Sequence, residues 1–363
     1  MPSSRFLFSN GIVYHSSEIP PVATFLEAHP GAYTTTRSHN NGSFLLFWER
    51  HLKRLCDSVR ILLDSHPKLL FGAEESLDSI RSLLMVSGAW ESVVHGLVND
   101  SMGKVLPIAL KERGNGEELS ITALISGNLE KLSEIEDLGG ERFGRIFDVH
   151  VHVGIYVPLV FGIRENGARL AAVGRGRETA AAKYSNWVRV RKPLEKLRPP
   201  SATELLLSND GNRLLEGSVS NFFVVCRKDK AEVKGTCSDD NESTHCFEVQ
   251  TAPVIDGVLP GIIRQLVIDV CLTKGIPFRE VAPLWSEREI WEEAFITNSL
   301  RLLQHVETIS VPNSWDSLLS KSWKEISWDY KKFEESPGMI TRIIQKEAME
   351  KAVQEGYLLS DFV

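Results

Sequence analysis

Apolar and polar residues alternate in two short segments near the start of the chain. Each segment has an Asn-Gly pair between its apolar runs: Asn10-Gly11 in "SRFLFSNGIVYHS" and Asn41-Gly42 in "GAYTTTRSHNNGSFLLFWERH". Asn-Gly is strongly favoured in tight hairpin turns because both residues tolerate positive φ. The pattern therefore predicts two β-hairpins.

The spacing of apolar residues then changes to that of an amphipathic helix. Leucines and a valine recur every three or four residues in "ERHLKRLCDSVRILLD", as on one face of an α-helix. A second helix is expected over 74–88, "EESLDSIRSLLMVSG". Runs of β-branched and other apolar residues predict three strands, at 105–113, 118–127 and 147–157. Residues 1–157 are therefore expected to form a small α+β domain.

A linker is expected at 158–164, and the remaining chain again mixes strand and helix patterns. Strands are expected at 168–176, on either side of the Asn-Asp-Gly turn within 203–228, and within 293–306. Helices are expected from Lys183 through 198, over 261–276 with Gly275 at the end, and over 336–356. Residues 165–363 are thus expected to form a larger, β-rich domain, with a polar loop at 228–247.

Composition and charge exclude several classes of partner. The 363 residues carry a net charge of −7, so there is no basic field to attract nucleic acid or an anionic membrane. No run of 18 apolar residues is present to span a membrane. The amino-terminal segment lacks a basic start followed by an apolar run, which a secretory signal needs. We therefore expect a cytoplasmic protein that binds neither nucleic acid nor membrane.

The cysteines and histidines show no strong metal-binding pattern. Five cysteines are present, with no C-x-x-C pair, which favours reduced thiols over a disulfide framework. Cys237, Cys246 and His245 cluster in the polar loop, and His150 and His152 share one face of a predicted strand. Zinc sites normally bring paired ligands at short spacing, so no metal is expected at either place.

One lysine stands in an unusual setting. In "TAAAKYSNW", residues 179–187, four small or β-branched residues precede Lys183. A lysine amine becomes a nucleophile toward carbonyls when burial or a nearby cation lowers its pKa. Pyridoxal phosphate is the commonest carbonyl partner of this kind, and its site also needs a carboxylate for the pyridine nitrogen and a cradle for the phosphate.

Other segments supply those groups. Glu216 lies in "LLEGSVSNFF", between a strand and a Gly-Ser bend. In "LPGIIRQLV" a helix is expected to begin just after Gly261, which leaves backbone N–H groups free for an anion. "FITNSL" offers further donors after a strand, and Arg54 in "ERHLKRL" is a candidate phosphate clamp. Each feature has an ordinary structural explanation when taken singly, so their order along the chain carries the interpretation.

That order resembles the class IV, or fold-type IV, pyridoxal-phosphate-dependent aminotransferases. The family includes the branched-chain and D-amino acid aminotransferases and aminodeoxychorismate lyase. "GAY", "HLKRL", "KYSN", "EGSVSNFF", "LPGIIR" and "FITNS" occur here in the family's order. The pair "EG-x-x-x-N-x-F" and "LPGI-x-R" is the most specific part. The resemblance implies a two-domain α/β (α+β) fold, with a smaller amino-terminal domain and a larger cofactor-holding domain.

The resemblance also implies roles for individual residues around the cofactor. Lys183 would be the catalytic Schiff-base lysine and would shuttle the proton. Glu216 would bind the pyridine nitrogen, and Leu259 would pack under the ring. The phosphate would be held by Arg54, by the backbone N–H groups of Ile262 and Ile263, and by Asn298 and Ser299.

Tyr33 and Arg113 are expected, by the same resemblance, to bind substrate. Two positions depart from the family pattern. Ile263 stands where the family has a threonine, so one hydroxyl contact to phosphate is missing. Thr34 stands where the D-amino acid enzymes, with "GVYE", have an acid.

The implied activity is transfer of an amino group from an amino acid, of branched-chain or D-amino acid type, to a 2-oxo acid. A homodimer would help to close the substrate pocket. Two alternatives stay open at this point. One is elimination of pyruvate from aminodeoxychorismate on the same scaffold, and the other is a catalytically weak relative that serves as a binding or scaffold protein.

Overall fold

The computed structural model describes residues 5–15, 18–72, 90–133, 144–228, 244–316, 318–334 and 336–362. The chain divides into two compact units. The first contains the residues up to Pro158, the segment Ala182–Val190 and the residues from Ala352 onward; the second contains Leu159–Ala181 and Arg191–Lys351. The second unit starts inside the expected linker. The return of two distant segments to the first unit was not predicted, because no local pattern signals it.

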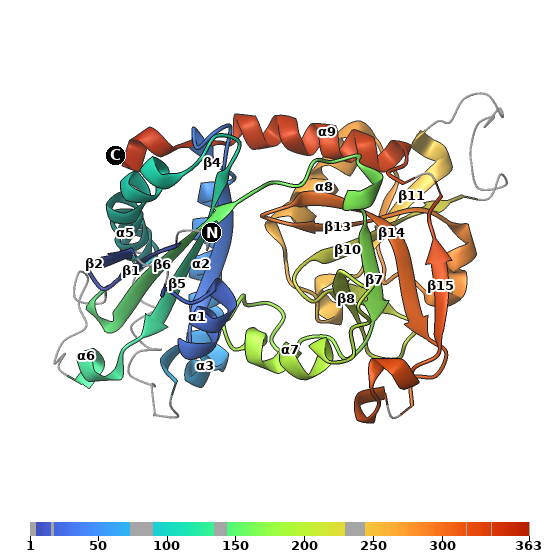
Figure 1. The fold of residues 1–363 in the computed structure, drawn as a ribbon, viewed down its shortest axis with the longest axis horizontal. Helices are drawn as coiled ribbons and strands as arrows, with labels where there is room; N and C mark the ends of the chain where they lie inside the picture. The colour runs from blue at the N-terminus through green and yellow to red at the C-terminus, as the bar shows by residue number, and fades with distance from the viewer. Residues whose placement is uncertain are drawn as a thin grey trace. The chain divides into compact units, whose positions relative to one another are not determined.

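The first unit is built on an antiparallel seven-stranded sheet with the order β16-β4-β3-β5-β6-β1-β2 (Figure 1). Its strands are β1 (Arg5–Ser9), β2 (Ile12–His15), β3 (Ala32–His39), β4 (Phe44–Leu45), β5 (Glu118–Gly127), β6 (Phe147–Tyr156) and β16 (Tyr357–Leu358). Both predicted hairpins are present, β1–β2 and β3–β4. Asn10 and Gly11 have φ values of +47° and +95°, as a tight hairpin turn requires.

The helices of this unit include α1 (Val22–Ala28), α2 (Trp48–Ser65), α3 (Pro67–Phe71), α5 (Trp90–Glu112) and α6 (Leu129–Ser133). Of these, α2, α3 and α5 pack on the sheet. The predicted apolar face of α2 is buried, and this helix lies against β3. The helix expected at 74–88 lies outside the described residues.

The strand expected at 105–113 is wrong, since this segment forms the end of α5. Its β-branched and apolar residues resemble a strand when read alone. Val98, Met102, Val105 and Ala109 nevertheless share one buried face at helical spacing. That face packs against β6 and β1, so tertiary packing overrides the local preference.

The second unit contains a nine-stranded sheet. Eight of its strands follow the order β12-β11-β10-β13-β14-β7-β8-β9, and the ninth, β15, pairs with β14. Its strands are β7 (Ala168–Ala172), β8 (Glu204–Ser208), β9 (Leu214–Gly217), β10 (Asn221–Arg227), β11 (Phe247–Thr251), β12 (Phe278–Glu280), β13 (Trp291–Asn298), β14 (Leu302–Pro312) and β15 (Trp328–Lys332). Asn221 pairs with Glu216 and thereby joins β10 to β9. Six strands, β10-β13-β14-β7-β8-β9, thus form a closed circuit, which Glu216 helps to close.

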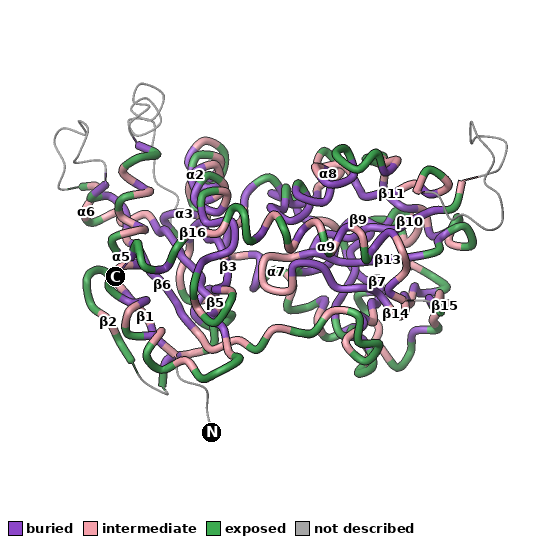
Figure 2. The backbone as a smooth tube through the Cα atoms, turned by 90° about the horizontal axis from the view of Figure 1, so that it is seen from above, coloured by how far each residue is buried: buried purple, intermediate pink, exposed green. Residues whose placement is uncertain are grey.

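Both faces of β10 are buried. Phe222 and Val224 point into one apolar cluster, whereas Phe223 and Val225 point into another, as expected from the alternation of side chains along a strand. Figure 2 shows the main strands of both sheets largely as buried chain. The segment 203–228, expected to hold one strand on each side of its turn, holds β8 before the turn and both β9 and β10 after it.

The remaining helices are α7 (Trp187–Glu195), which begins in the first unit, α8 (Ile262–Lys274) and α9 (Met339–Gln354). Short 3-10 helices are η2 (Arg164–Asn166), η3 (Thr244–Cys246), η4 (Val254–Asp256), η5 (Trp285–Ile290), η6 (Leu318–Ser320), η7 (Trp323–Glu325) and η8 (Leu359–Phe362). Gly275 ends α8 with φ +65°, as predicted. Lys183 lies four residues before α7 rather than at its start.

The cysteines depart in part from the expectation. Cys56, Cys226 and Cys271 are buried free thiols, and burial raises the pKa of each to about 12. Cys246 is disulfide-bonded, so the prediction of reduced thiols throughout is wrong at this position. The spacing of the cysteines did not indicate this disulfide.

Candidate functional site

The backbone of Lys183 is tied to the first unit by hydrogen bonds to β3 and α2. The N–H of Tyr33 donates to the carbonyl of Lys183 at 3.0 Å, and the N–H of Lys183 donates to Ser58 Oγ at 3.1 Å. Ala182, just before it, is fully buried. A bulky side chain at that position would push this segment away from its anchors. The small residues before Lys183 therefore have a structural reason.

The amine of Lys183 lies over an aromatic ring. Its Nζ is 4.7 Å from the ring centroid of Tyr33, a cation–π distance. Tyr33 itself is buried against Phe25, Leu26 and Leu124. Lys183 and Tyr33, a predicted catalytic residue and a predicted substrate residue, are thus brought together.

Arg54 belongs to a chain of polar groups between β3 and α2. Its Nη2 donates to Thr34 Oγ1 at 2.8 Å, and Thr34 Oγ1 lies 2.7 Å from Nδ1 of His51. Thr34 and His51 are fully buried. Burial lowers the pKa of His51 well below its usual value, and the charges of Arg54 and Lys183 lower it further. Thr34, noted in the sequence only as a departure, and His51 were not predicted to belong to the site.

Glu216 lies at the centre of a second polar group, in the second unit. Nε of Arg177 is 2.7 Å from Oε1 of Glu216, and both side chains are almost fully buried. The N–H of Leu259 donates to Oε2 at 3.1 Å, and Asn221 Nδ2 donates to the same oxygen at 3.4 Å. These contacts favour the ionised carboxylate, because each one stabilises negative charge on its oxygens.

Sequence reasoning missed Arg177. Its ion pair with Glu216 crosses 39 positions, from 177 to 216, which no local pattern reveals. The available signal was indirect, since a carboxylate buried between strands needs a cationic or hydrogen-bonding partner.

The start of α8 is built close to this carboxylate. Gly261 is the N-cap of α8, and the helix has no side-chain cap, so its first N–H groups, including those of Ile262 and Ile263, are positioned to bind an anion. A Cβ on Gly261 would lie 2.0 Å from Asn221 Oδ1, so only glycine fits. The side chain of Ile263 is buried, as is that of Leu259.

The end of β13 carries the remaining predicted phosphate residues. Asn298 Oδ1 accepts hydrogen bonds from the N–H groups of Leu300 and Arg301, so this oxygen shapes the turn that contains Ser299. Beside it, Thr297 is buried, and its hydroxyl has no hydrogen-bond partner among the described residues. A buried hydroxyl without a partner costs free energy, which makes Thr297 a further candidate that the sequence did not single out.

Arg113 does not join Lys183 and Tyr33. Its Nη1 donates to the carbonyl oxygens of Gly114 and Glu117, at 2.9 and 2.7 Å, so the guanidinium holds its own turn after α5. Arg37 is the cation that follows Tyr33 by four positions in β3, and it therefore lies on the same face of that strand. Arg37 is buried, and burial lowers its pKa; the sequence interpretation overlooked it.

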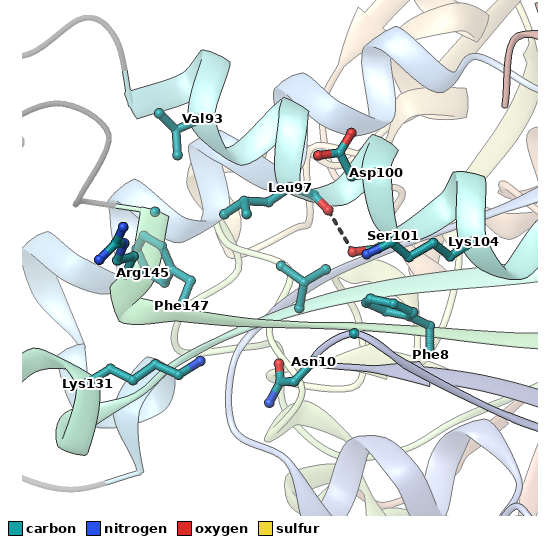
Figure 3. Close-up of a pocket in the computed structure, with 13 residues that line it drawn as sticks. Phe8, Asn10, Val93, Leu97, Asp100, Ser101, Lys104, Lys131, Arg145 and Phe147 are labelled. Atoms are coloured by element: carbon teal, nitrogen blue, oxygen red, sulfur yellow. Dashed lines mark hydrogen bonds between the residues drawn. The ribbon is translucent and has the colours of Figure 1, made fainter.

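A cavity of about 700 Å³ occurs elsewhere in the first unit (Figure 3). Phe8, Leu97 and Phe147 form apolar parts of its lining, and Lys104 and Lys131 are among its charged residues. Lys104 lies against the ring of Phe8, and Lys131 pairs with Asp148 outside the lining. None of the predicted site residues lines this cavity, and we assign it no part in the site.

Among the described residues no group of three or more His, Cys, Asp or Glu side chains is arranged to hold a metal ion. His150 and His152 instead bond to Ser9 and to the carbonyl of Pro20. Over the same described ranges, no helix has the length and apolar character needed to cross a membrane.

Comparisons with known proteins agree with the resemblance seen in the sequence. Residues 162–309 match the family described as amino-transferase class IV. No curated protein matches the chain. A branched-chain aminotransferase from Thermoproteus uzoniensis, solved with norvaline, has 17% identity and a TM-score of 0.55, with 97% of this chain and 96% of that chain covered.

Two further solved structures give the same result. A putative branched-chain amino acid aminotransferase from Thermotoga maritima has 17% identity and a TM-score of 0.56, over 97% of this chain and 98% of that chain. The PLP-bound form of a hypothetical aminotransferase from Mycobacterium tuberculosis has 15% identity and a TM-score of 0.54, over 95% and 99%. The predicted fold is confirmed. Residues 162–309 therefore match the class IV aminotransferase family, and the whole chain has the fold of these solved aminotransferases.

Proposed function

We propose that the protein is a pyridoxal-phosphate-dependent aminotransferase that transfers an amino group from an amino acid to a 2-oxo acid. The observation that carries the proposal is the setting of Lys183. Its backbone is fixed on both sides, and its amine lies over Tyr33. Solved relatives from Mycobacterium tuberculosis and Brucella abortus hold this cofactor.

The residues present fit the cofactor. Glu216 is a buried, hydrogen-bonded carboxylate suited to a protonated pyridine nitrogen, and the uncapped start of α8 suits a phosphate. Thr297 offers a buried hydroxyl that lacks a partner among the described residues. Arg54 would add a cation to the phosphate, Leu259 would lie under the ring, and Lys183 would bind the aldehyde carbon.

The chemistry follows from these positions. When bound, pyridoxal phosphate draws electrons away from the substrate Cα, so that its proton becomes removable. The amine of Lys183 would take that proton and return it at the other end of the three-atom system. Glu216 would keep the pyridine nitrogen protonated, because its own negative charge is held by Arg177 and the N–H of Leu259.

The apolar surroundings of Tyr33 support an amino acid with an apolar side chain, of branched-chain type, over a D-amino acid substrate. Phe25, Leu26, Leu124 and Val188 pack around Tyr33. Arg37, on the same face of β3, would be a cation for the substrate carboxylate.

The proposal is tested with purified protein, pyridoxal phosphate, 2-oxoglutarate and a panel of L- and D-amino acids. Glutamate formation from leucine, isoleucine or valine is the expected result. Lys183→Ala protein is the control and should form none. Pyruvate release from aminodeoxychorismate, without amino transfer, would replace the proposal with the lyase reaction. Failure of the wild-type protein to bind pyridoxal phosphate would reject both.

We also propose a homodimer. Four large apolar side chains between β6 and η2 are strongly exposed in a single copy, namely Val157 (65%), Leu159 (51%), Val160 (61%) and Ile163 (43%). A contiguous apolar run of this kind favours burial against a partner. Light scattering of the purified protein should give twice the chain mass, and Val160→Glu should shift it toward the monomer.

A further inference from the structure

Glu204, the first residue of β8, uses its two carboxylate oxygens for two different turns of the second unit. Its side chain is only 3% exposed. Oε1 accepts hydrogen bonds from the hydroxyl of Ser220 at 2.6 Å and from the N–H of Val219 at 3.1 Å. Oε2 accepts from Nη2 of Arg301 at 2.6 Å. One buried carboxylate therefore joins the turn between β9 and β10 to the turn between β13 and β14.

Both turns adjoin residues of the proposed cofactor site. The first turn leads from the end of β9, which contains Glu216, to Asn221 at the start of β10. The second turn follows Asn298, the last residue of β13, and contains Ser299. Asn221 pairs with Thr297 across the two strands, so the two turns lie at adjacent positions along one edge of the sheet.

Each turn is tightly fitted to this carboxylate or to its partner. A Cβ on Gly217 would lie 2.4 Å from Glu204 Oε1, so the first turn fits only when residue 217 has no side chain. In the second turn, the N–H of Arg301 donates to Asn298 Oδ1 at 2.9 Å, and its Nη1 donates to Gln304 Oε1 at 2.7 Å. Arg301 is thus held through its backbone as well as its side chain, so a pull on its guanidinium acts directly on the turn.

We infer that Glu204 and Arg301 are positioning residues, which hold the two turns at a fixed separation and thereby set the phosphate donors after β13 relative to Glu216. The inference rests on the proposed function, in which Glu216 binds the pyridine nitrogen and Asn298 and Ser299 bind the phosphate. Both residues act through the turns and not by contact with the cofactor. Because their charges compensate each other, the pair fixes the turns without adding net charge.

Stabilisation of the fold alone is the competing explanation, since a buried carboxylate needs partners wherever it lies. The chain offers a matched control in Glu293 of β13, which is also buried. Its oxygens accept from the N–H groups of Ile340 and Thr341 at 2.9 and 2.8 Å. These contacts hold the start of α9, which carries no predicted cofactor residue. Glu293→Gln therefore alters a similarly buried carboxylate of the same unit, five residues before Asn298 and outside both turns.

The test combines urea denaturation of apo-protein with fluorescence titration of pyridoxal phosphate and of pyridoxal, which lacks the phosphate. Arg301→Met leaves the buried carboxylate without its cation and should lower the urea midpoint. The double variant Glu204→Gln/Arg301→Met removes that charge and should recover most of the midpoint. Glu293→Gln should lower the midpoint without changing the affinity for either compound.

The cofactor affinities should separate from stability. Arg301→Met and the double variant should both bind pyridoxal phosphate about ten-fold more weakly, the equivalent of one hydrogen bond to a charged group, because the donors of the second turn are no longer held in place. Binding of pyridoxal should not change, since residue 204 keeps its Oε1 contacts with the first turn.

Wild-type affinity for pyridoxal phosphate in the double variant would overturn the inference, because stability would then explain the whole effect. Unchanged affinity in Arg301→Met, an equal loss for pyridoxal, or an equal loss in Glu293→Gln would overturn it as well. Failure of the wild-type protein to bind pyridoxal phosphate would instead overturn the proposed function.

Discussion

The two units place different partners beside a charged side chain. In the first unit, Arg54 donates a hydrogen bond to Thr34, a neutral group, and His51 behind it stays neutral as well. In the second unit, Glu216 is paired directly with Arg177, and both side chains are almost fully buried. Removal of a partner should therefore matter more in the second unit, because a buried carboxylate without its cation is costly.

Breaking the ion pair in the second unit should have the largest effect on stability. Arg177→Met leaves the carboxylate of Glu216 buried without its cation, which costs about 3–5 kcal/mol. Urea denaturation should show this loss in the free energy of unfolding. The double variant Arg177→Met/Glu216→Gln should recover most of it but remain inactive. A loss below about 1 kcal/mol in the single variant, the range of a surface pair, would mean that the pair is not buried as described.

The arginine of the first unit should matter for the cofactor more than for stability. Arg54→Ala should weaken pyridoxal phosphate binding by roughly 2–4 kcal/mol, or about 30- to 800-fold. The free energy of unfolding of the apo-protein should change less than in Arg177→Met, because Arg54 is only partly buried. Titration of apo-protein, together with urea denaturation, measures both quantities. The contrast between the units would fail if the apo-protein lost as much stability as Arg177→Met does.

Acid should destabilise the first unit before the second. Burial lowers the pKa of His51, His150 and His152 in the first unit, to about 4 for His150, and it also lowers the pKa of His305 in the second unit. In the unfolded chain, His150 binds a proton below its usual pKa of about 6.5, whereas in the folded protein it stays neutral until the pH approaches 4. The stability that neutral His150 contributes is therefore complete above a pH of about 6.5 and is lost as the pH falls toward 4. His150 alone should lower the free energy of unfolding by about 2 kcal/mol between pH 7 and pH 5.

Hydrogen exchange at these two pH values measures the effect in each unit. Protection factors, which correct for the slower intrinsic exchange at lower pH, should fall more in β6 and α2 than in β10 and β13. His150→Gln should reduce the difference between the units, because glutamine does not titrate. An equal fall in both units would show that the buried histidines of the first unit do not set the response to acid.

The smallest expected effect concerns the start of α8. Ile263→Thr adds a hydroxyl at a helix N-terminus, where an anion already draws on backbone donors. One hydrogen bond to a charged group contributes about 1.5–3 kcal/mol at most, and part of it is offset because the buried isoleucine loses packing. Cofactor loss on dialysis should therefore slow a few-fold, with substrate preference unchanged. Faster loss would mean that residue 263 serves the core alone.

Local sequence patterns correctly predicted the elements that depend only on adjacent residues. The Asn-Gly hairpins, the apolar face of α2 and the glycine that ends α8 each depend on a few adjacent residues. The strand expected at 105–113 was wrong because packing against β6 decided in favour of α5. The resemblance led to Lys183 and Glu216 through motifs that also contain Tyr33, Asn221 and Leu259, whereas Arg177 and Ser58 lie outside those motifs.

Contacts between residues on different elements could not be predicted in the same way. Arg177 meets Glu216 across the closure of the strand circuit, and Thr34 meets His51 and Arg54 between a strand and a helix. Neither pairing follows from spacing. Arg113 shows the opposite outcome. Its position in the sequence suited a substrate-binding residue, but its guanidinium is already bonded within its own turn.

The account depends most directly on where the cofactor attaches. Purified protein is incubated with pyridoxal phosphate, reduced with borohydride, digested, and analysed by mass spectrometry. We expect the reduced cofactor on Lys183, in near-stoichiometric yield, and none on any lysine of the Lys183→Ala protein. Attachment to another lysine of the wild type, or no attachment at all, would contradict the assignment of Lys183 and with it the proposed function.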